Sequence, residues 1–165
     1  MPDTDGVPVD DVVRRVNETL TRADSLFGSA SVDTSLNPQL LTAAADALRR
    51  SVVSDMSGLA ATGYDTLAQQ QASTLAGLAT TDTAFNDILQ SAASAENTAA
   101  ATSRSTVASA TEYADSRTPA TESPGGQRAL IAGLHSTVSR QRELVQRHQK
   151  QATEFAEQLR LLSYD

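Results

Sequence analysis

The chain has 165 residues, a net charge of −7 at pH 7, 4% aromatic residues and no cysteine. This length suits one domain with a core of modest size. The acidic balance argues against nucleic acid as a partner, and the lack of cysteine excludes disulfides, thiolate nucleophiles and cysteine-type metal sites. No run of about 18 apolar residues occurs, and the N-terminal MPDTDGVPVDD has no apolar stretch. We therefore expect neither a transmembrane segment nor a conventional signal peptide.

The first amphipathic segment covers residues 9–27, where apolar side chains recur at steps of three and four. This spacing predicts a helix. Pro8 suits its first position, where a missing N–H costs nothing, and Gly28 suits the cap just past its end.

A second helix is predicted over 38–79. Asn37 can cap its free N–H groups, and Pro38 fits its first turn. Because glycine weakens a helix interior, Gly58 and Gly63 predict a break or turn at 58–64.

A third helix is predicted over 82–115, with Thr81 or Asp82 as its cap. Ala, Ser and Thr dominate this segment. Neither Lys nor Arg occurs from residue 51 through residue 103, so the middle of the chain presents only acidic and neutral groups.

The segment 116–126 combines two prolines with a glycine pair, which predicts an interhelical loop. The last helix is expected over 127–162, and its apolar line alternates steps of three and four, as in a supercoiled helical pair. We take this line as the candidate interaction seam: Ile131, Leu134, Val138, Gln141, Val145, His148, Phe155, Leu159 and Leu162.

Together these segments predict an all-α fold, an elongated four-helix bundle that ends in a long antiparallel hairpin. We expect one domain over 1–165 with a flexible N-terminus at 1–8. Residues 126–165 hold 6 basic and 4 acidic side chains against 7 and 16 in the rest, so the last helix can lie on the remainder with favourable charge.

The seam is expected to face the helix at 82–115, where Gln141 and His148 would meet small Ser, Thr and Asn side chains. Polar residues inside an apolar seam lower stability but restrict alignment. Replacing His148 by Leu is therefore expected to raise thermal stability.

No residue pattern indicates catalysis, a metal or a cofactor. His135 and His148 are 13 residues apart on one helix, too far to share a metal ion. Acidic neighbours such as Asp10 and Asp11 fall at a helix start rather than in a cleft. The glycines match neither a P-loop nor a dinucleotide fingerprint, and no serine has nucleophile-elbow context. We expect a protein that is not an enzyme and that acts through a helical protein partner or through self-association.

The stretch TDTAFNDILQSAASAENTAAATSR and the closing AEQLRLLSYD resemble an uncharacterised helical domain of actinobacteria, which accompanies ESX-type (type VII) secretion substrates and cell-wall hydrolases. The resemblance covers residues 40–165. The chain departs from small ESX substrates because it has no Trp for a WxG turn. It also has no Tyr-x-x-x-Asp/Glu export signal at Tyr64, Tyr113 or Tyr164. An export signal would have to come from a partner or from additional sequence.

The resemblance implies a non-catalytic interaction protein linked to type VII secretion or the cell envelope. Such a protein is cytoplasmic before export and then secreted or envelope-associated without a conventional signal peptide. Two other functions fit the residues. One is a surface-coating amphipathic helical structural protein, suggested by the Ala/Ser/Thr-rich 82–115 segment, and the other is a targeting domain of a cell-wall enzyme.

Overall fold

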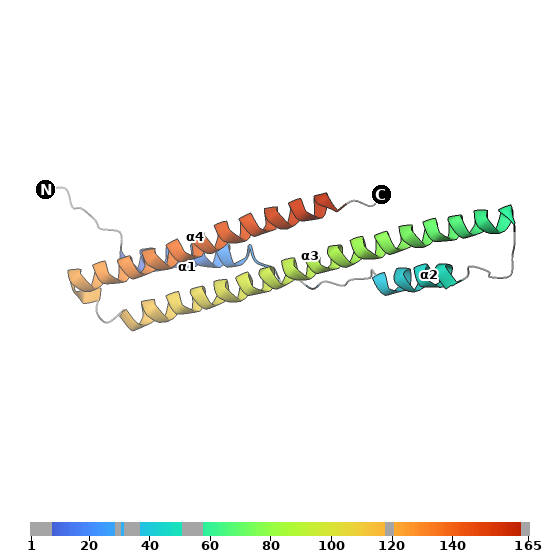
Figure 1. Cartoon of the computed structure of the whole chain (residues 1–165). Helices are drawn as coiled ribbons and strands as arrows, with labels where there is room; N and C mark the ends of the chain where they lie inside the picture. The colour runs from blue at the N-terminus through green and yellow to red at the C-terminus, as the bar shows by residue number, and fades with distance from the viewer. Residues whose placement is uncertain (1–7, 29–30, 32–36, 51–57, 118–120, 163–165) are drawn as a thin grey trace. The chain divides into compact units, whose positions relative to one another are not determined.

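The structure is a computed structural model that describes residues 8–28, 31, 37–50, 58–117 and 121–162. Its helices are α1 (Val9–Asp24), α2 (Pro38–Arg50), α3 (Leu59–Arg117) and α4 (Pro124–Leu161) (Figure 1). Since these ranges contain no strand, the all-α prediction is confirmed. Apart from Pro8, the N-terminus predicted to be flexible lies outside the described residues.

The first residues of α2 and α4 follow turn and cap chemistry. The Asn37 Oδ1 atom accepts a hydrogen bond from the Gln39 N–H at 3.2 Å, so the predicted cap of α2 is confirmed. Helix α4 begins three residues earlier than predicted. Pro124 takes its first position, and the Ser123 hydroxyl accepts a hydrogen bond from the Gly126 N–H at 3.1 Å.

Helix α3 is one continuous helix, so the separate start predicted near Thr81 or Asp82 is wrong. The hydroxyls of Thr80, Thr81 and Thr83 donate to carbonyl oxygens four residues earlier, at 3.0, 3.2 and 2.8 Å. A hydroxyl satisfied in this way does not cap a new helix. Gly63, inside the predicted break, also lies within α3.

Helix α3 begins inside the break predicted at 58–64 and ends at Arg117 rather than residue 115. Gly58, just before α3, has a φ of +113°, a conformation that glycine adopts without strain. Helix α1 ends at Asp24 rather than residue 27. The N–H of Gly28 bonds Glu96 of α3 and does not cap α1.

The contacts divide the chain into two compact units. Unit 1 consists of Met1–Ser31 and Ala92–Thr153, and therefore holds α1, the second half of α3 and most of α4. Unit 2 consists of Val32–Ser91 and Glu154–Asp165, and holds α2, the first half of α3 and the end of α4. Because α3 and α4 belong to both units, the single domain over 1–165 stays a prediction.

Within unit 1, α3 and α4 run antiparallel, as the predicted hairpin requires (Figure 1). Ser103 bonds Gln141, while Glu96, seven residues earlier in α3, bonds His148, seven residues later in α4. This is one heptad on each helix, the spacing of a supercoiled pair. In unit 2, α2 lies beside the first half of α3 (Figure 1).

Candidate functional site

The predicted interaction seam on α4 is covered unevenly. Leu134 and Gln141 are buried, whereas Ile131 is 43% exposed. The fully buried position at the start of the seam is Leu130, one residue earlier, which packs with Leu134 and Ala114. The remaining seam residues are half-buried: Val138, Val145, His148, Phe155, Leu159 and Leu162.

Helix α3 presents a matching line of small side chains. Its buried residues fall on one row of the helix, whose positions alternate steps of three and four, and half-buried residues such as Leu75 and Leu89 occupy the row's other positions. The buried residues of this line are Ala68, Ala72, Ala79, Asp82, Ala100, Ser103, Ala110 and Ala114, with Ala99 beside it. Small side chains let two helices approach closely but bury little area each. Sequence reasoning expected bulkier residues such as Leu67 and Gln71 on this face, and both are exposed.

The centre of unit 1 holds a buried polar pair. Gln141 Nε2 donates to the Ser103 hydroxyl at 2.7 Å, and both side chains are almost completely buried. Gln141 Oε1 is buried without a hydrogen-bond partner among the described residues. The expectation that Gln141 meets a small polar side chain is confirmed, and the pair favours one alignment of the two helices.

A second polar group, the Glu96 carboxylate of α3, contacts both the chain just after α1 and a histidine of α4. Glu96 Oε1 accepts a hydrogen bond from the Gly28 N–H at 2.6 Å, and Glu96 Oε2 lies 2.8 Å from His148 Nε2. The Phe27 ring meets the His148 ring edge-on, with centroids 5.2 Å apart. His148 therefore meets a carboxylate and an aromatic ring instead of the small polar side chains expected from the sequence.

This arrangement does not suit proton transfer to a substrate. His148 Nε2 is engaged by Glu96, and His148 Nδ1 is buried without a hydrogen-bond partner among the described residues. The geometry therefore supports a packing role for the imidazole, which joins α1, α3 and α4. His135, the other histidine, is exposed.

Near the loop between α3 and α4, a glycine brings the two helices into close contact. A Cβ added at Gly133 would overlap the Tyr113 ring. The Tyr113 hydroxyl donates to the Ala129 carbonyl at 3.1 Å, and the Arg117 guanidinium lies 5.6 Å from the ring centroid. Sequence reasoning did not identify this contact, because a lone glycine in a helix carries no signal of its neighbour.

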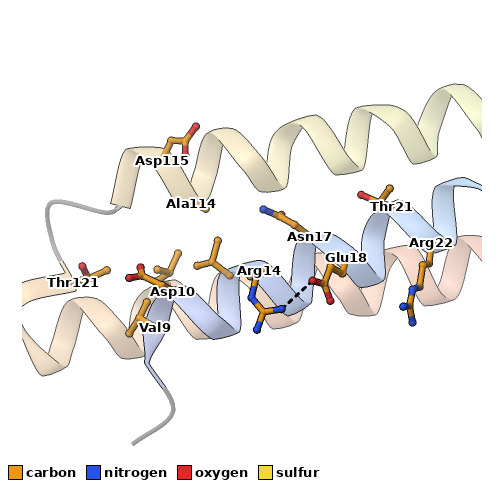
Figure 2. A pocket seen from close by; sticks show the side chains of 12 residues that line it. Val9, Asp10, Arg14, Asn17, Glu18, Thr21, Arg22, Ala114, Asp115 and Thr121 are labelled. Carbon is orange, nitrogen blue, oxygen red and sulfur yellow. Dashed lines mark hydrogen bonds and ion pairs between the residues drawn. The ribbon is translucent and has the colours of Figure 1, made fainter.

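An open groove of about 680 Å³ runs along α1 in unit 1 (Figure 2). Arg14 within it donates to Glu18 at 3.1 Å and to Asp11 at 2.9 Å. The hydrogen bond from Arg14 lowers the pKa of Asp11, and the same bond raises the pKa of Arg14. The groove is lined by Val9, Asp10, Val13, Arg14, Asn17, Glu18, Thr21, Arg22, Ala114, Asp115, Thr121 and Leu130.

Unit 2 differs because none of the bulky apolar side chains among its described residues is buried. Leu40 of α2 is 68% exposed, and Tyr64 and Leu67 of α3 are 48% and 53% exposed. The buried side chains among its described residues are four alanines and one aspartate: Ala45, Ala68, Ala72, Ala79 and Asp82. This uncovered apolar surface is the strongest candidate for binding another molecule.

Among the described residues, no three His, Asp or Glu side chains are placed to hold a metal ion. In the same residues, no helix has a stretch long and apolar enough to cross a membrane. Comparison of the chain with protein-family models, with curated proteins and with solved structures finds no match.

Proposed function

We propose that this chain is a non-catalytic protein that binds a helical protein partner through unit 2, and that it works in or beside type VII secretion or the cell envelope. The observation that carries the binding role is the exposure of Leu40, Tyr64 and Leu67, which lie on the two helices of one compact unit. Bulky apolar side chains grouped in this way commonly mark protein–protein interfaces.

The link to secretion and the envelope is supported by the resemblance of residues 40–165 to the actinobacterial helical domain. A helical partner agrees with the way α3 presents its side chains. The exposed bulky side chains lie beside the buried line of small residues, and adjacent rows of side chains of this kind are the surface that another helix packs against.

Site-specific photo-crosslinking in cells that produce the full chain tests the binding role. A photoreactive phenylalanine analogue replaces Leu67 in one variant and Ser73 in a control, because Ser73 is exposed on the same helix and is not part of its exposed bulky apolar surface. We expect a discrete adduct with a helical protein from position 67, identified by mass spectrometry, and no such adduct from position 73. Equal labelling from both positions, or none from either, would contradict the binding role.

Cell fractionation tests the secretion role separately. The chain should be found in the envelope fraction or the medium when the type VII apparatus is functional, and should be retained in the cytoplasm when it is disabled. A chain that stays in the cytoplasm in both cases would remove secretion from the proposal.

A further inference from the structure

The register of α3 and α4 leaves part of α3 without α4 beside it. Glu96 faces His148, and two further heptads along the same register place Leu162 opposite Asp82. Helix α4 ends at Leu161, so residues 59–81 of α3 extend past it. At 1.5 Å per residue, this stretch is about 34 Å long.

Helix α2 covers only part of this stretch. It has 13 residues and is therefore about 20 Å long. Its buried residue is Ala45, while Leu41 and Leu48, on the same line of α2, are half-buried. Past the end of α4, the described residues of unit 2 leave α2 and α3 as a pair of helices. Two helices have one contact face each, so this pair cannot enclose a core as three helices do.

Beside its buried alanine line, α3 carries a second line of bulky residues that we call the α3 stripe. Leu67 and Leu78 each come one residue before a buried alanine, Ala68 and Ala79, so the stripe lies next to the alanine line on the helix surface. The polar residues Gln71, Thr74 and Thr81 occupy the positions of this row between the bulky ones. Its first two members are exposed and the rest half-buried: Tyr64, Leu67, Leu78, Phe85 and Ile88. An apolar surface of this kind is complete only when a further helix packs on it.

The charge around the α3 stripe is negative. The described part of unit 2 has three arginines (Arg49, Arg50 and Arg160) and six carboxylates (Asp46, Asp65, Asp82, Asp87, Glu154 and Glu157), a net charge of −3. None of the three arginines lies on α3, since neither Lys nor Arg occurs from residue 51 through residue 103.

Two side chains of unit 2 show how this charge is presented. Arg49 is paired with Asp46 at 3.2 Å, so its positive charge is already matched. Asp65, next to Tyr64 and two residues from Leu67, accepts one hydrogen bond on Oδ2 from Gln69. Its Oδ1 is buried without a hydrogen-bond partner among the described residues, so the carboxylate is only partly accessible to a partner.

From the open helix pair, the α3 stripe and the negative charge, we infer that the partner contributes a basic amphipathic helix. This helix packs along α2 and residues 59–81 of α3, the stretch that extends past α4. Its apolar side chains cover Tyr64 and Leu67, and a flanking Lys or Arg side chain approaches Asp65. The inference rests on the proposed function and specifies its partner.

Charge also disfavours a second copy of this chain as the occupant. Two such surfaces facing each other would bring acidic α3 segments together, and like charges across an interface oppose association. A basic helix gains attraction from the same groups, and the attraction weakens as salt screens it.

The test uses the full chain and two labelled synthetic peptides of 23 residues, about the length of the uncovered stretch of α3. Both carry Leu at alternating steps of three and four. One has Lys beside the Leu positions, and the other has Glu in place of each Lys. Fluorescence anisotropy measures the Kd of each at low and high salt. We expect the Lys peptide to bind at least ~10-fold more tightly than the Glu peptide at low salt, with a smaller difference at high salt.

Three variants locate the binding. Leu67→Gln removes apolar area from the α3 stripe and should weaken the Lys peptide about tenfold, while Ser73→Gln should leave its Kd unchanged. Asp65→Asn should weaken it about threefold. Circular dichroism of each variant checks that its helical content is that of the parent chain.

Each outcome of the peptide test either supports or overturns the inference. Equal binding of the two peptides, or binding that Leu67→Gln does not affect, would overturn it. A dimer of the chain that Leu67→Gln dissociates would replace the basic helix by a second copy. The crosslinking experiment separates the two claims, because an adduct from position 67 with an acidic or neutral helical protein would keep the proposed function and reject the basic partner.

Discussion

The same helix, α3, is covered differently in the two units. In unit 1 its small side chains face leucines from the neighbouring helices, and Leu20, Leu130 and Leu134 are completely or almost completely buried. In unit 2 three of its alanines, Ala68, Ala72 and Ala79, are buried, but bulky neighbours such as Leu67 stay exposed. Burial of alanine contributes little to stability, because each methyl removes little area from water. The difference therefore separates a region that holds the fold together from a region available for binding.

The largest test of this comparison is the truncation of one leucine in each unit. Leu134→Ala should lower the free energy of unfolding by about 3 kcal/mol, since it leaves a cavity in unit 1. Leu67→Ala should change it by less than about 0.5 kcal/mol, because the side chain is already half in water. Urea denaturation followed by circular dichroism measures both. Similar losses at the two positions would show that Leu67 is covered in solution.

The second test concerns the buried hydrogen bond between Ser103 and Gln141 in unit 1. Ser103→Ala removes the hydrogen-bond partner of Gln141 inside the core, and should lower the free energy of unfolding by about 2 kcal/mol. Adding Gln141→Leu to Ser103→Ala should restore much of this loss, because no buried amide is then left unpaired. A double-mutant cycle measures the coupling, and strictly additive changes would mean that the hydrogen bond contributes nothing.

His148→Leu should lower the free energy of unfolding by about 1 kcal/mol. This reverses the expectation from sequence, because the structure gives the imidazole a specific carboxylate partner, Glu96. His135→Leu is the matched control on the same helix, and should have little effect since His135 is exposed. Thermal denaturation compares the two variants. A more stable His148→Leu variant would show that the Glu96 contact does not form in solution.

The smallest expected effects come from replacing one glycine in each unit. Gly133→Ala places a methyl group where the Tyr113 ring lies, and should lower stability by up to about 1 kcal/mol. Gly63→Ala meets no atom within 4 Å and should raise stability by about 0.5 kcal/mol through better helix propensity. Opposite shifts of the melting temperature would confirm the comparison. Shifts of the same sign would show that Tyr113 moves aside freely.

The all-α class and the antiparallel hairpin were predictable from the sequence, because the seam of α4 repeats without interruption and the Pro/Gly-rich segment indicates a turn. The bounds of that turn were not predictable, since Pro124, Gly125 and Gly126 form the start of α4. The continuity of α3 was not. Thr81 and Asp82 carry the residue types of a helix cap, but the helical backbone runs through both residues, and the Thr81 hydroxyl bonds the Gly77 carbonyl instead of capping a new helix. The residue types at Thr81 and Asp82 are compatible both with the start of a new helix and with a helix that continues.

The candidate site was predictable in part. The predicted α4 seam shares Leu134 and Gln141 with the buried residues of α4. At two other positions the buried residue is one earlier, Leu130 for Ile131 and Leu144 for Val145. The buried line of α3 was missed, because alanine gives almost no periodic contrast against Ser and Thr. The bulky residues that do give contrast, such as Leu67, lie on the neighbouring line. The hydropathy pattern therefore identified the exposed face of α3 that contains Leu67 and not the face that is buried against other helices.

The hydrogen bonds of the threonine hydroxyls in α3 affect the hydration of the helix surface. Thr66, Thr74 and Thr102 each donate the hydroxyl proton to a carbonyl one turn earlier, at 2.9, 3.1 and 2.8 Å. Their hydroxyl protons are thus used within the helix, so its exterior offers solvent fewer donors than its Ser/Thr content implies. Such a surface is weakly hydrated for its composition. Excluded solutes such as sulfate or sucrose, which favour burial of exposed surface, should therefore promote association along α3 more than its polar sequence would lead one to expect.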